Sequence, residues 1–308
     1  MNNFSKLLGG AALTVALSST AFAGSAEGPL VSSDWLASHL DDPSVHVFEV
    51  SVNPNVYSEG HIPGAVNLAW HTDLVDPVRR DIISKAALEK GLREAGVDEG
   101  DTIVIYGDTN NWFAAWGVWV FDIYGVEAKL LDGGRQLWAA EGRDLVTDVA
   151  EANVEAGDIE LSAANEDLRA RLVDVVRASE TGAADIVDIR SSKEYSGELI
   201  APPGLKETAV RAGHVTGAVN VSWGNAVAED GRFKSPEELR EIYATNGVDG
   251  SKPVITYCRI GERSSHTWFA LSKILGYDAK NYDGSWTEYG NSVGVPITNV
   301  AGTVWTGK

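Results

Sequence analysis

The chain has 308 residues, of which 44% are hydrophobic and 22% are charged, which is enough for about two packed domains. This composition excludes a disordered or collagen-like chain. The formal net charge of −19 argues against binding to nucleic acid or to an anionic membrane surface, because like charges repel. An anionic small molecule would therefore need a local positive group in its binding site.

The first 23 residues have the pattern of a secretory signal peptide. Lys6 supplies one positive charge, an apolar stretch begins at Leu7, and Ala21-Phe22-Ala23 has the form of a cleavage site. The apolar stretch is too short and too rich in small residues for a good membrane span. We therefore expect residues 1–23 to be removed and the mature protein to be exported to the periplasm without a membrane span.

Predicted elements occur in the same order in two halves of the chain. Each half has a buried strand, a G-H-x-x-G-A-V-N segment, a serine-capped helix, a second buried strand, a second helix and a short strand before Asp-Gly. The strands are predicted at 45–50 and 101–106, then at 184–189 and 252–257; the helices at 84–96 and 112–125, then at 235–247 and 264–276. A further helix is predicted at 168–182. This alternation predicts two tandem α/β domains, each a mainly parallel sheet flanked by helices.

The order reflects an internal duplication. GHIPGAVNLAW at 60–70 recurs as GHVTGAVNVSW at 213–223. Tyr106 precedes Asp132 by 26 residues, and Tyr257 precedes Asp283 by the same number, so this region aligns without a gap. We place the two domains at 28–145 and 168–300, with the acidic stretch 146–167 as a linker.

The alignment sets Gly107 of the first domain opposite Cys258 of the second. The first domain is therefore expected to keep the scaffold without a catalytic cysteine. The alternative is a pair of binding domains with an incidental cysteine.

Cys258 is the only cysteine of the chain, so it is either an inert buried side chain or a reactive thiol. It follows the predicted strand 252–257, and a helix begins shortly after it. Parallel sheets bind ligands beyond the carboxyl ends of their strands, which is where this residue lies. Loop amides and the charges of Arg259 and Arg263 would stabilise the thiolate, which is the nucleophilic form. We therefore predict a reactive thiol.

The loop after the cysteine has two further features. Gly261 permits the tight curl that would let several amides face the sulfur. Glu262 would oppose a thiolate if it pointed inward, so we expect it to point out or to pair with an arginine. The cysteine and Arg263 have C-x4-R spacing, whereas phosphatases use C-x5-R, which argues against phosphate chemistry.

The duplicated G-H-x-x-G-A-V-N segment, the strand–cysteine–loop–helix unit and the D-G-S-W at 283–286 together resemble the two-domain rhodaneses, the thiosulfate sulfurtransferases, in their exported bacterial form. The resemblance covers nearly all of the mature chain. Related 3-mercaptopyruvate sulfurtransferases typically carry C-G-S-G-V-T in the loop. Two arginines suit a doubly charged thiosulfate better than a singly charged keto acid.

The resemblance implies that Cys258 takes the outer sulfur of thiosulfate as a persulfide and passes it to cyanide or a thiol, with no metal or organic cofactor. It also implies that the substrate-binding residues are Arg259, Ile260, Gly261, Glu262, Arg263 and Ser264. The alternatives are a 3-mercaptopyruvate sulfurtransferase and a persulfide carrier that delivers sulfur to a partner.

Asp188 and Arg190 match the family's D-x-R after the first strand of the catalytic domain. We interpret them as a supporting pair first and, for Arg190, as a substrate contact second. The chain departs from the vertebrate enzymes, because Ile260 and Glu194 stand where those carry lysine and arginine. Charge recognition is then left to Arg259, Arg263, Arg190 or Arg211.

The expected partners are small molecules and not nucleic acid. The six histidines show no metal-ligand spacing, so no metal site is predicted. We expect a monomer, because a duplicated chain already supplies its own two-domain contact.

Overall fold

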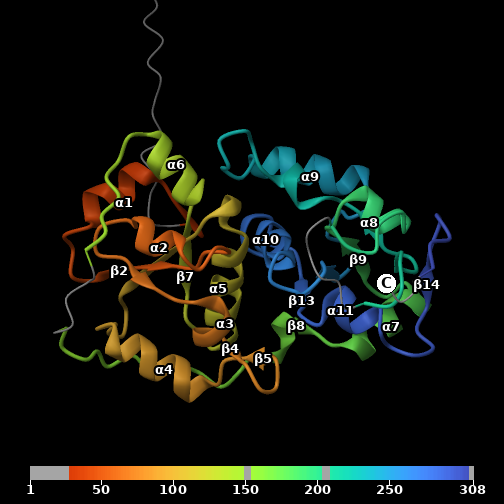
Figure 1. Ribbon diagram of the computed structural model, residues 1–308, viewed down its shortest axis with the longest axis horizontal. Coiled ribbons are helices and arrows are strands. Elements are labelled where there is room, and N and C mark those ends of the chain that lie inside the picture. The colour runs from red at the N-terminus through yellow and green to blue at the C-terminus, as the bar shows by residue number, and fades with distance from the viewer. Residues whose placement is uncertain (1–27, 149–153, 203–208, 305–308) are drawn as a thin grey trace, which may run out of the picture.

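The computed structural model describes residues 28–148, 154–202 and 209–304 (Figure 1). The predicted signal peptide, 1–23, lies outside the described residues, and so does 149–153 of the predicted linker. Two α/β units lie side by side, one in the red-to-yellow half and one in the green-to-blue half of the chain. Within the described ranges, no helix has both the length and the apolar character that crossing a bilayer would require.

The first unit is built on a five-stranded parallel sheet with the order β1-β7-β6-β2-β3. Its strands are β1 (Leu30–Val31), β2 (Val45–Glu49), β3 (Val66–Asn67), β6 (Thr102–Tyr106) and β7 (Ala128–Leu131). Its helices are α1 (Ser33–His39), α2 (Val56–Glu59), α3 (Trp70–Asp73), α4 (Lys85–Glu94), α5 (Trp112–Ile123) and α6 (Gly134–Ala140). A small antiparallel hairpin of β4 (Val75–Asp76) and β5 (Asp81–Ile82) projects from this unit.

The second unit repeats this arrangement with the order β11-β9-β12-β13-β8, and its sheet is also parallel. Its strands are β8 (Arg169–Ala170), β9 (Asp185–Asp188), β11 (Val219–Asn220), β12 (Val254–Tyr257) and β13 (Ala279–Tyr282). Its helices are α7 (Leu172–Thr181), α8 (Ser192–Ser196), α9 (Pro236–Thr245), α10 (Ser264–Trp268) and α11 (Ser285–Tyr289). A separate antiparallel pair joins β10 (His214–Val215) to β14 (Ile297–Thr298). The predicted fold class is confirmed.

Two predicted helices differ in detail from the structure. The helix predicted from residue 168 begins at Leu172, because Arg169 and Ala170 pair with β13 as an edge strand. The helix predicted at 264–276 is α-helical over α10 and continues as a π-helix over Phe269–Ile274. Helices α4 and α9 agree closely, with Ser84 and Ser235 as N-caps.

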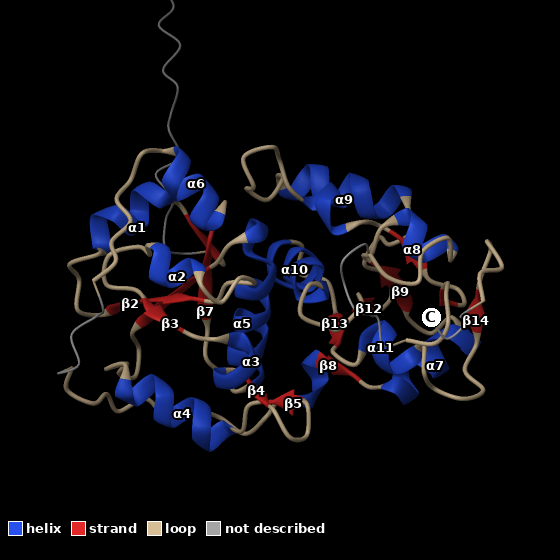
Figure 2. Cartoon of the chain, viewed as in Figure 1, coloured by secondary structure: helices blue, strands red, loops and turns tan. Residues whose placement is uncertain are grey.

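Each sheet has helices on both faces, and the strand pattern explains why (Figure 2). Successive side chains of a strand point to opposite faces. Ile103 and Ile105 of β6 therefore join the core beneath α4 and α5, whereas Val104 joins the core beneath α1 and α6. A strand buried on both faces needs a continuous apolar run, as β6 has.

The two units share one hydrophobic core. A single cluster contains Trp119 and Phe121 of α5 together with Phe269 and Leu271, which follow α10. Figures 1 and 2 show α5 and α10 adjacent at the centre of the molecule. Burial of large apolar side chains stabilises such an interface by roughly 1.5–3 kcal/mol per side chain. The units are therefore held in a fixed relation, which matters for the site below.

Gly107 has no room for a side chain. A Cβ atom on this residue would lie 2.2 Å from the carbonyl oxygen of Val50. Real atoms do not approach so closely, so any larger residue must displace backbone. The first unit therefore cannot hold a cysteine at the position that corresponds to Cys258 unless its backbone shifts.

We predict that Gly107→Ala lowers the free energy of unfolding by about 1–3 kcal/mol, because the added methyl group overpacks a rigid backbone site. Urea denaturation would measure this loss. The matched control is Gly91→Ala on exposed α4, where a Cβ meets nothing within 4 Å and stability should be unchanged or higher by up to about 1 kcal/mol. A Gly107→Ala protein as stable as the wild type would contradict the close contact.

Candidate active site

Cys258 lies at the end of the central strand of the second sheet. Strand β12 is buried along its whole length and pairs with β9 on one side and β13 on the other. Cys258 follows it directly and has no exposed surface. The predicted position at the carboxyl edge of the sheet is thus where the structure places the residue, although the thiol is more deeply buried than the polar loop sequence suggests.

Backbone and hydroxyl groups surround the sulfur. The amide of Gly261 donates to Cys258 Sγ over 3.2 Å. Ser285 Oγ lies 4.0 Å from the sulfur, donates to the carbonyl of Tyr282 and accepts from the amide of Cys258. The hydroxyl of Ser285 therefore positions the cysteine backbone, while the loop amide is directed at the sulfur itself.

The segment after β13 holds the loop in place. The amides of Trp286 and Thr287 donate to the carbonyls of Cys258 and Arg259. Gly261 has a φ of +104°, and a Cβ there would lie 2.2 Å from the carbonyl oxygen of Asp283. Glycine is required at this position on both counts, since side chains disfavour a positive φ and no space is available. The D-G-S-W motif and the cysteine loop are therefore one interlocked structure.

Burial and local charge act in opposite directions on the Cys258 thiol. Burial raises its pKa, whereas the charge of Arg263, the amides of Gly261 and Ile260, and the Ser264 side chain lower it. The lowering influences prevail, and the pKa lies below the ordinary value for a thiol. The site thus makes the thiolate, which is the form a nucleophile needs, more accessible than in an ordinary thiol.

Two arginines of the cysteine loop differ from the other described arginines in having no partner for their charge. Among the described residues, Arg259 and Arg263 are the arginines whose guanidinium groups make neither a hydrogen bond nor an ion pair. The guanidinium carbon of Arg263 lies 5.3 Å from the ring centre of Trp112, which belongs to the first unit. Both charges remain available to an anion.

Glu262 points inward and is 2% exposed. The prediction allowed it to point out or to pair with an arginine, and it pairs: Arg80 Nη2 lies 3.3 Å from Glu262 Oε1. Arg80 belongs to the first unit and was not among the predicted site residues. No local pattern indicates this partner, because Arg80 and Glu262 lie 182 positions apart in the chain.

Asp188 and Arg190 form a buried ion pair. Arg190 is 1% exposed, and its Nη2 donates to Asp188 Oδ2 over 2.6 Å and to the carbonyl of Gly213 over 2.7 Å. Tyr257 also donates to Asp188. This geometry favours the supporting role over a substrate contact. The same holds for Arg211, whose guanidinium donates to backbone carbonyls such as that of Gly290.

The first unit contains an equivalent of this cluster. Tyr106 donates to Glu49 over 2.5 Å, and Arg135 lies 3.3 Å from the same carboxylate. Because it occurs beside Gly107, where there is no thiol, the cluster serves the scaffold.

His266 of α10 is buried and stacks on Phe233 with ring centres 4.4 Å apart. Burial lowers the pKa of His266 to about 3, so the ring stays neutral at physiological pH. It is therefore a packing residue and not a proton donor.

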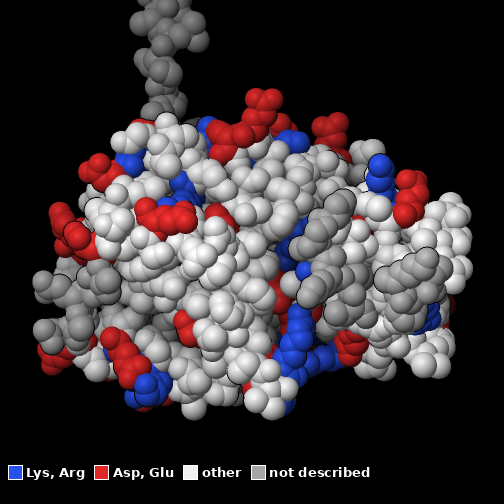
Figure 3. All heavy atoms as spheres, viewed as in Figure 1, with Lys and Arg blue, Asp and Glu red and all other residues white. Residues whose placement is uncertain are grey.

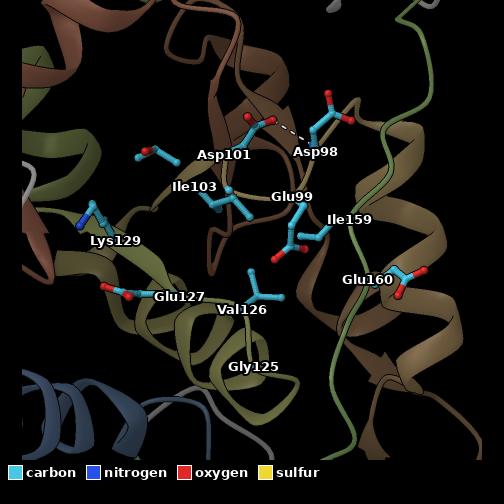
Figure 4. Close-up of a pocket in the computed structure, with 12 residues that line it drawn as sticks. Asp98, Glu99, Asp101, Ile103, Gly125, Val126, Glu127, Lys129, Ile159 and Glu160 are labelled. Carbon is cyan, nitrogen blue, oxygen red and sulfur yellow. Dashed lines mark hydrogen bonds between the residues drawn. The ribbon is translucent and has the colours of Figure 1, made fainter.

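A separate hollow of about 360 Å³ lies in the first unit (Figure 4). It sits at the amino ends of β6 and β7, whereas the candidate active site lies at the carboxyl end of β12 in the second unit. Its lining includes Asp98, Glu99, Asp101, Glu127 and Glu160. So many carboxylates disfavour an anionic ligand.

Comparison with known proteins bears directly on this site. The family model described as the rhodanese-like domain matches residues 32–141 and 172–292. The chain belongs to the rhodanese family. Both copies of the rhodanese domain are matched, in agreement with the two sheets.

Three proteins that are similar to this rhodanese have names that refer to sulfur transfer or to carrying sulfur. A protein of Saccharopolyspora erythraea, provisionally named a thiosulfate sulfurtransferase, is 48% identical over 89% of this chain and 98% of its own. The sulfur carrier protein TtuD of Thermus thermophilus is 47% identical over 87% of this chain and 95% of its own. The Escherichia coli 3-mercaptopyruvate sulfurtransferase SseA has a similar structure, with a TM-score of 0.72, 28% identity and coverage of 84% and 99%. These findings support sulfurtransferase activity and leave the substrate open.

We predict that Arg263→Ala slows alkylation of Cys258 at pH 7 by about threefold to tenfold, because loss of the nearby charge raises the thiol pKa. Arg259→Ala should have a smaller effect, since Arg259 is not among the groups that lower this pKa most. The rate of iodoacetamide labelling against pH measures both. Equal shifts in the two variants would contradict this assignment.

Proposed function

We propose that this rhodanese is a thiosulfate sulfurtransferase that carries the transferred sulfur as a persulfide on Cys258. The observation that carries the proposal is a thiol with a lowered pKa in a loop that has two arginines without an ion-pair partner among the described residues. A thiolate supplies the nucleophile, and the arginines supply the charge that a dianionic sulfur donor requires.

The first half-reaction conserves charge without a proton or an oxidant. The Cys258 thiolate attacks the outer sulfur of thiosulfate, and a bond forms between Sγ and that sulfur. The sulfur–sulfur bond of thiosulfate breaks, and its electron pair leaves with sulfite. Three negative charges enter, and three remain, on the persulfide and on sulfite.

The second half-reaction restores the thiolate. Cyanide or a thiolate acceptor attacks the outer sulfur of the persulfide, and the bond to Sγ breaks with its electron pair on Cys258. The products are thiocyanate or an acceptor persulfide. The amides of Gly261 and Ile260, which favour the thiolate, would also favour the persulfide anion.

Charge distinguishes thiosulfate from the main alternative donor. Thiosulfate carries two negative charges near neutral pH, whereas 3-mercaptopyruvate carries one on its carboxylate. Two unpaired guanidinium groups in one loop match the dianion better. The SseA-like structure supports the mercaptopyruvate alternative, and the name of TtuD supports the sulfur-carrier alternative.

We further propose that the protein is exported and acts as a monomer on small molecules. The leader-like residues 1–23 support export. The shared core between the two units supports a monomer, because the chain already buries the face that each domain would otherwise expose.

Steady-state kinetics with both donors tests the substrate. We predict a higher kcat/KM for thiosulfate than for 3-mercaptopyruvate, with cyanide as acceptor. Arg259→Ala should raise the KM for thiosulfate about tenfold and that for mercaptopyruvate less, since one charge-assisted contact to a dianion is lost.

The matched control is Arg177→Ala on exposed α7, whose partner Asp174 is also at the surface and whose loss should change neither KM. A preference for mercaptopyruvate would overturn the substrate assignment. Sulfur loading followed by very slow release to cyanide and small thiols would favour the carrier function instead.

A further inference from the structure

The turn between β4 and β5 carries an arginine in a strained conformation. Arg80 has a φ of +51°, in the left-handed region that side chains other than glycine seldom adopt. Such strain persists only where the surroundings enforce it, and it is frequent at functional sites. The equivalent residue of the second unit shows whether the turn itself requires a side chain in this conformation.

The equivalent residue is glycine. Cys258 and Gly107 are 151 positions apart (258 − 107), and the helix caps Ser235 and Ser84 show the same offset. The same offset pairs Arg80 with Gly231 (231 − 80 = 151), which has a φ of +85°. One unit thus makes this turn with the residue that suits it, and the other unit tolerates strain to present a guanidinium group.

That guanidinium group reaches across to the cysteine loop of the second unit. Arg80 Nη2 lies 3.0 Å from the carbonyl oxygen of Ile260 and 3.3 Å from Glu262 Oε1. These two partners flank Gly261, whose amide donates to the sulfur. Figure 3 shows basic side chains gathered on this part of the surface, and the hollow there is lined by Arg79, Arg80, Arg169 and Arg171.

The contact of Arg80 with the cysteine loop is important because it places a cation beside Glu262. Its carboxylate is buried, and Oε2 has no hydrogen-bond partner among the described residues. Burial raises the pKa of Glu262, as do the charges of Asp283 and Cys258, whereas Arg80 lowers it. Asp283 in turn faces Arg169 of β8, Arg80 and Asp81.

We propose that Arg80 is a positioning residue, supplied by the first unit, that offsets the charge of Glu262 and fixes the Ile260 peptide so that the loop can hold an anionic sulfur. This rests on the proposed role of Cys258 as the sulfur-carrying nucleophile. It also gives the first unit, which lacks a thiol, a direct part in the reaction of the second.

Loss of Arg80 disfavours the thiolate in either protonation state of Glu262. An ionised Glu262 would become an unpaired anion beside the sulfur. A protonated Glu262 would no longer need a cation, but the Ile260 carbonyl would still lose its donor, and the amides near the sulfur would lose their fixed direction. Both changes raise the pKa of Cys258.

The test compares Arg80→Gln, Arg80→Lys and Arg80→Gly with Arg79→Gln, a control in the same turn whose side chain is 72% exposed. The readouts are the pH profile of Cys258 alkylation without substrate, and kcat/KM for thiosulfate. We expect Arg80→Gln to shift the profile to higher pH and to lower kcat/KM at pH 7 about fivefold to tenfold. Arg80→Lys should be intermediate, and Arg79→Gln should match the wild type.

Arg80→Gly separates positioning from stability. It relieves the positive φ, so its melting temperature should exceed that of Arg80→Gln, which loses the same contacts, while its alkylation profile shifts as in Arg80→Gln. In a Glu262→Gln background the shift caused by Arg80→Gln should shrink. An equal shift in both backgrounds would overturn the part assigned to Glu262, and Arg80 variants that match Arg79→Gln would overturn the whole proposal.

Failure of the role assigned to Arg80 and failure of the proposed function would give different results. The alkylation profile needs no sulfur donor, whereas the function is judged by sulfur loading of wild-type Cys258. A wild-type protein that takes no sulfur, with Arg80 variants that still shift the profile, would refute the function and retain the role of Arg80 at the thiol.

Discussion

The stabilisation of one negative charge on a buried sulfur is the constraint on which this site depends. Cys258 has no exposed surface, and burial alone would keep its thiol protonated. The loop amides and Arg263 outweigh the effect of burial and lower the pKa, but only if the loop keeps its shape. The buried strand β12, the glycine at 261 and the D-G-S-W segment all serve that shape. The chemistry is therefore a consequence of how tightly the end of one strand is held.

The duplication supplies more than a second copy of the fold. The first unit has no room for a cysteine at Gly107, yet it places Trp112 beneath Arg263 and Arg80 against the cysteine loop. The shared core around α5 and α10 fixes the distance over which these contacts are made. On a chain with a net charge of −19, Arg263 and Arg80 supply local positive charge at the cysteine loop.

The sequence was sufficient for the fold class, the repeat and the place of Cys258, because these follow from periodicity and from a motif whose parts lie close together in the chain. The sequence was not sufficient for features that depend on contacts between segments far apart in the chain. The local sequence predicts helix for Arg169 and Ala170, which instead pair with β13 in the folded chain. Nothing near Glu262 in the sequence indicates its contact with Arg80. The supporting pair of Asp188 and Arg190, by contrast, was predicted, because the two residues lie close together in the chain.

Intact-protein mass spectrometry of the purified protein, first with thiosulfate and then with cyanide, tests the central claim most directly. The account predicts that the wild type gains the mass of one sulfur atom and loses it to cyanide as thiocyanate forms, whereas Cys258→Ser gains nothing. A wild-type protein that takes up no sulfur from thiosulfate, or a Cys258→Ser protein that still does, would contradict the account.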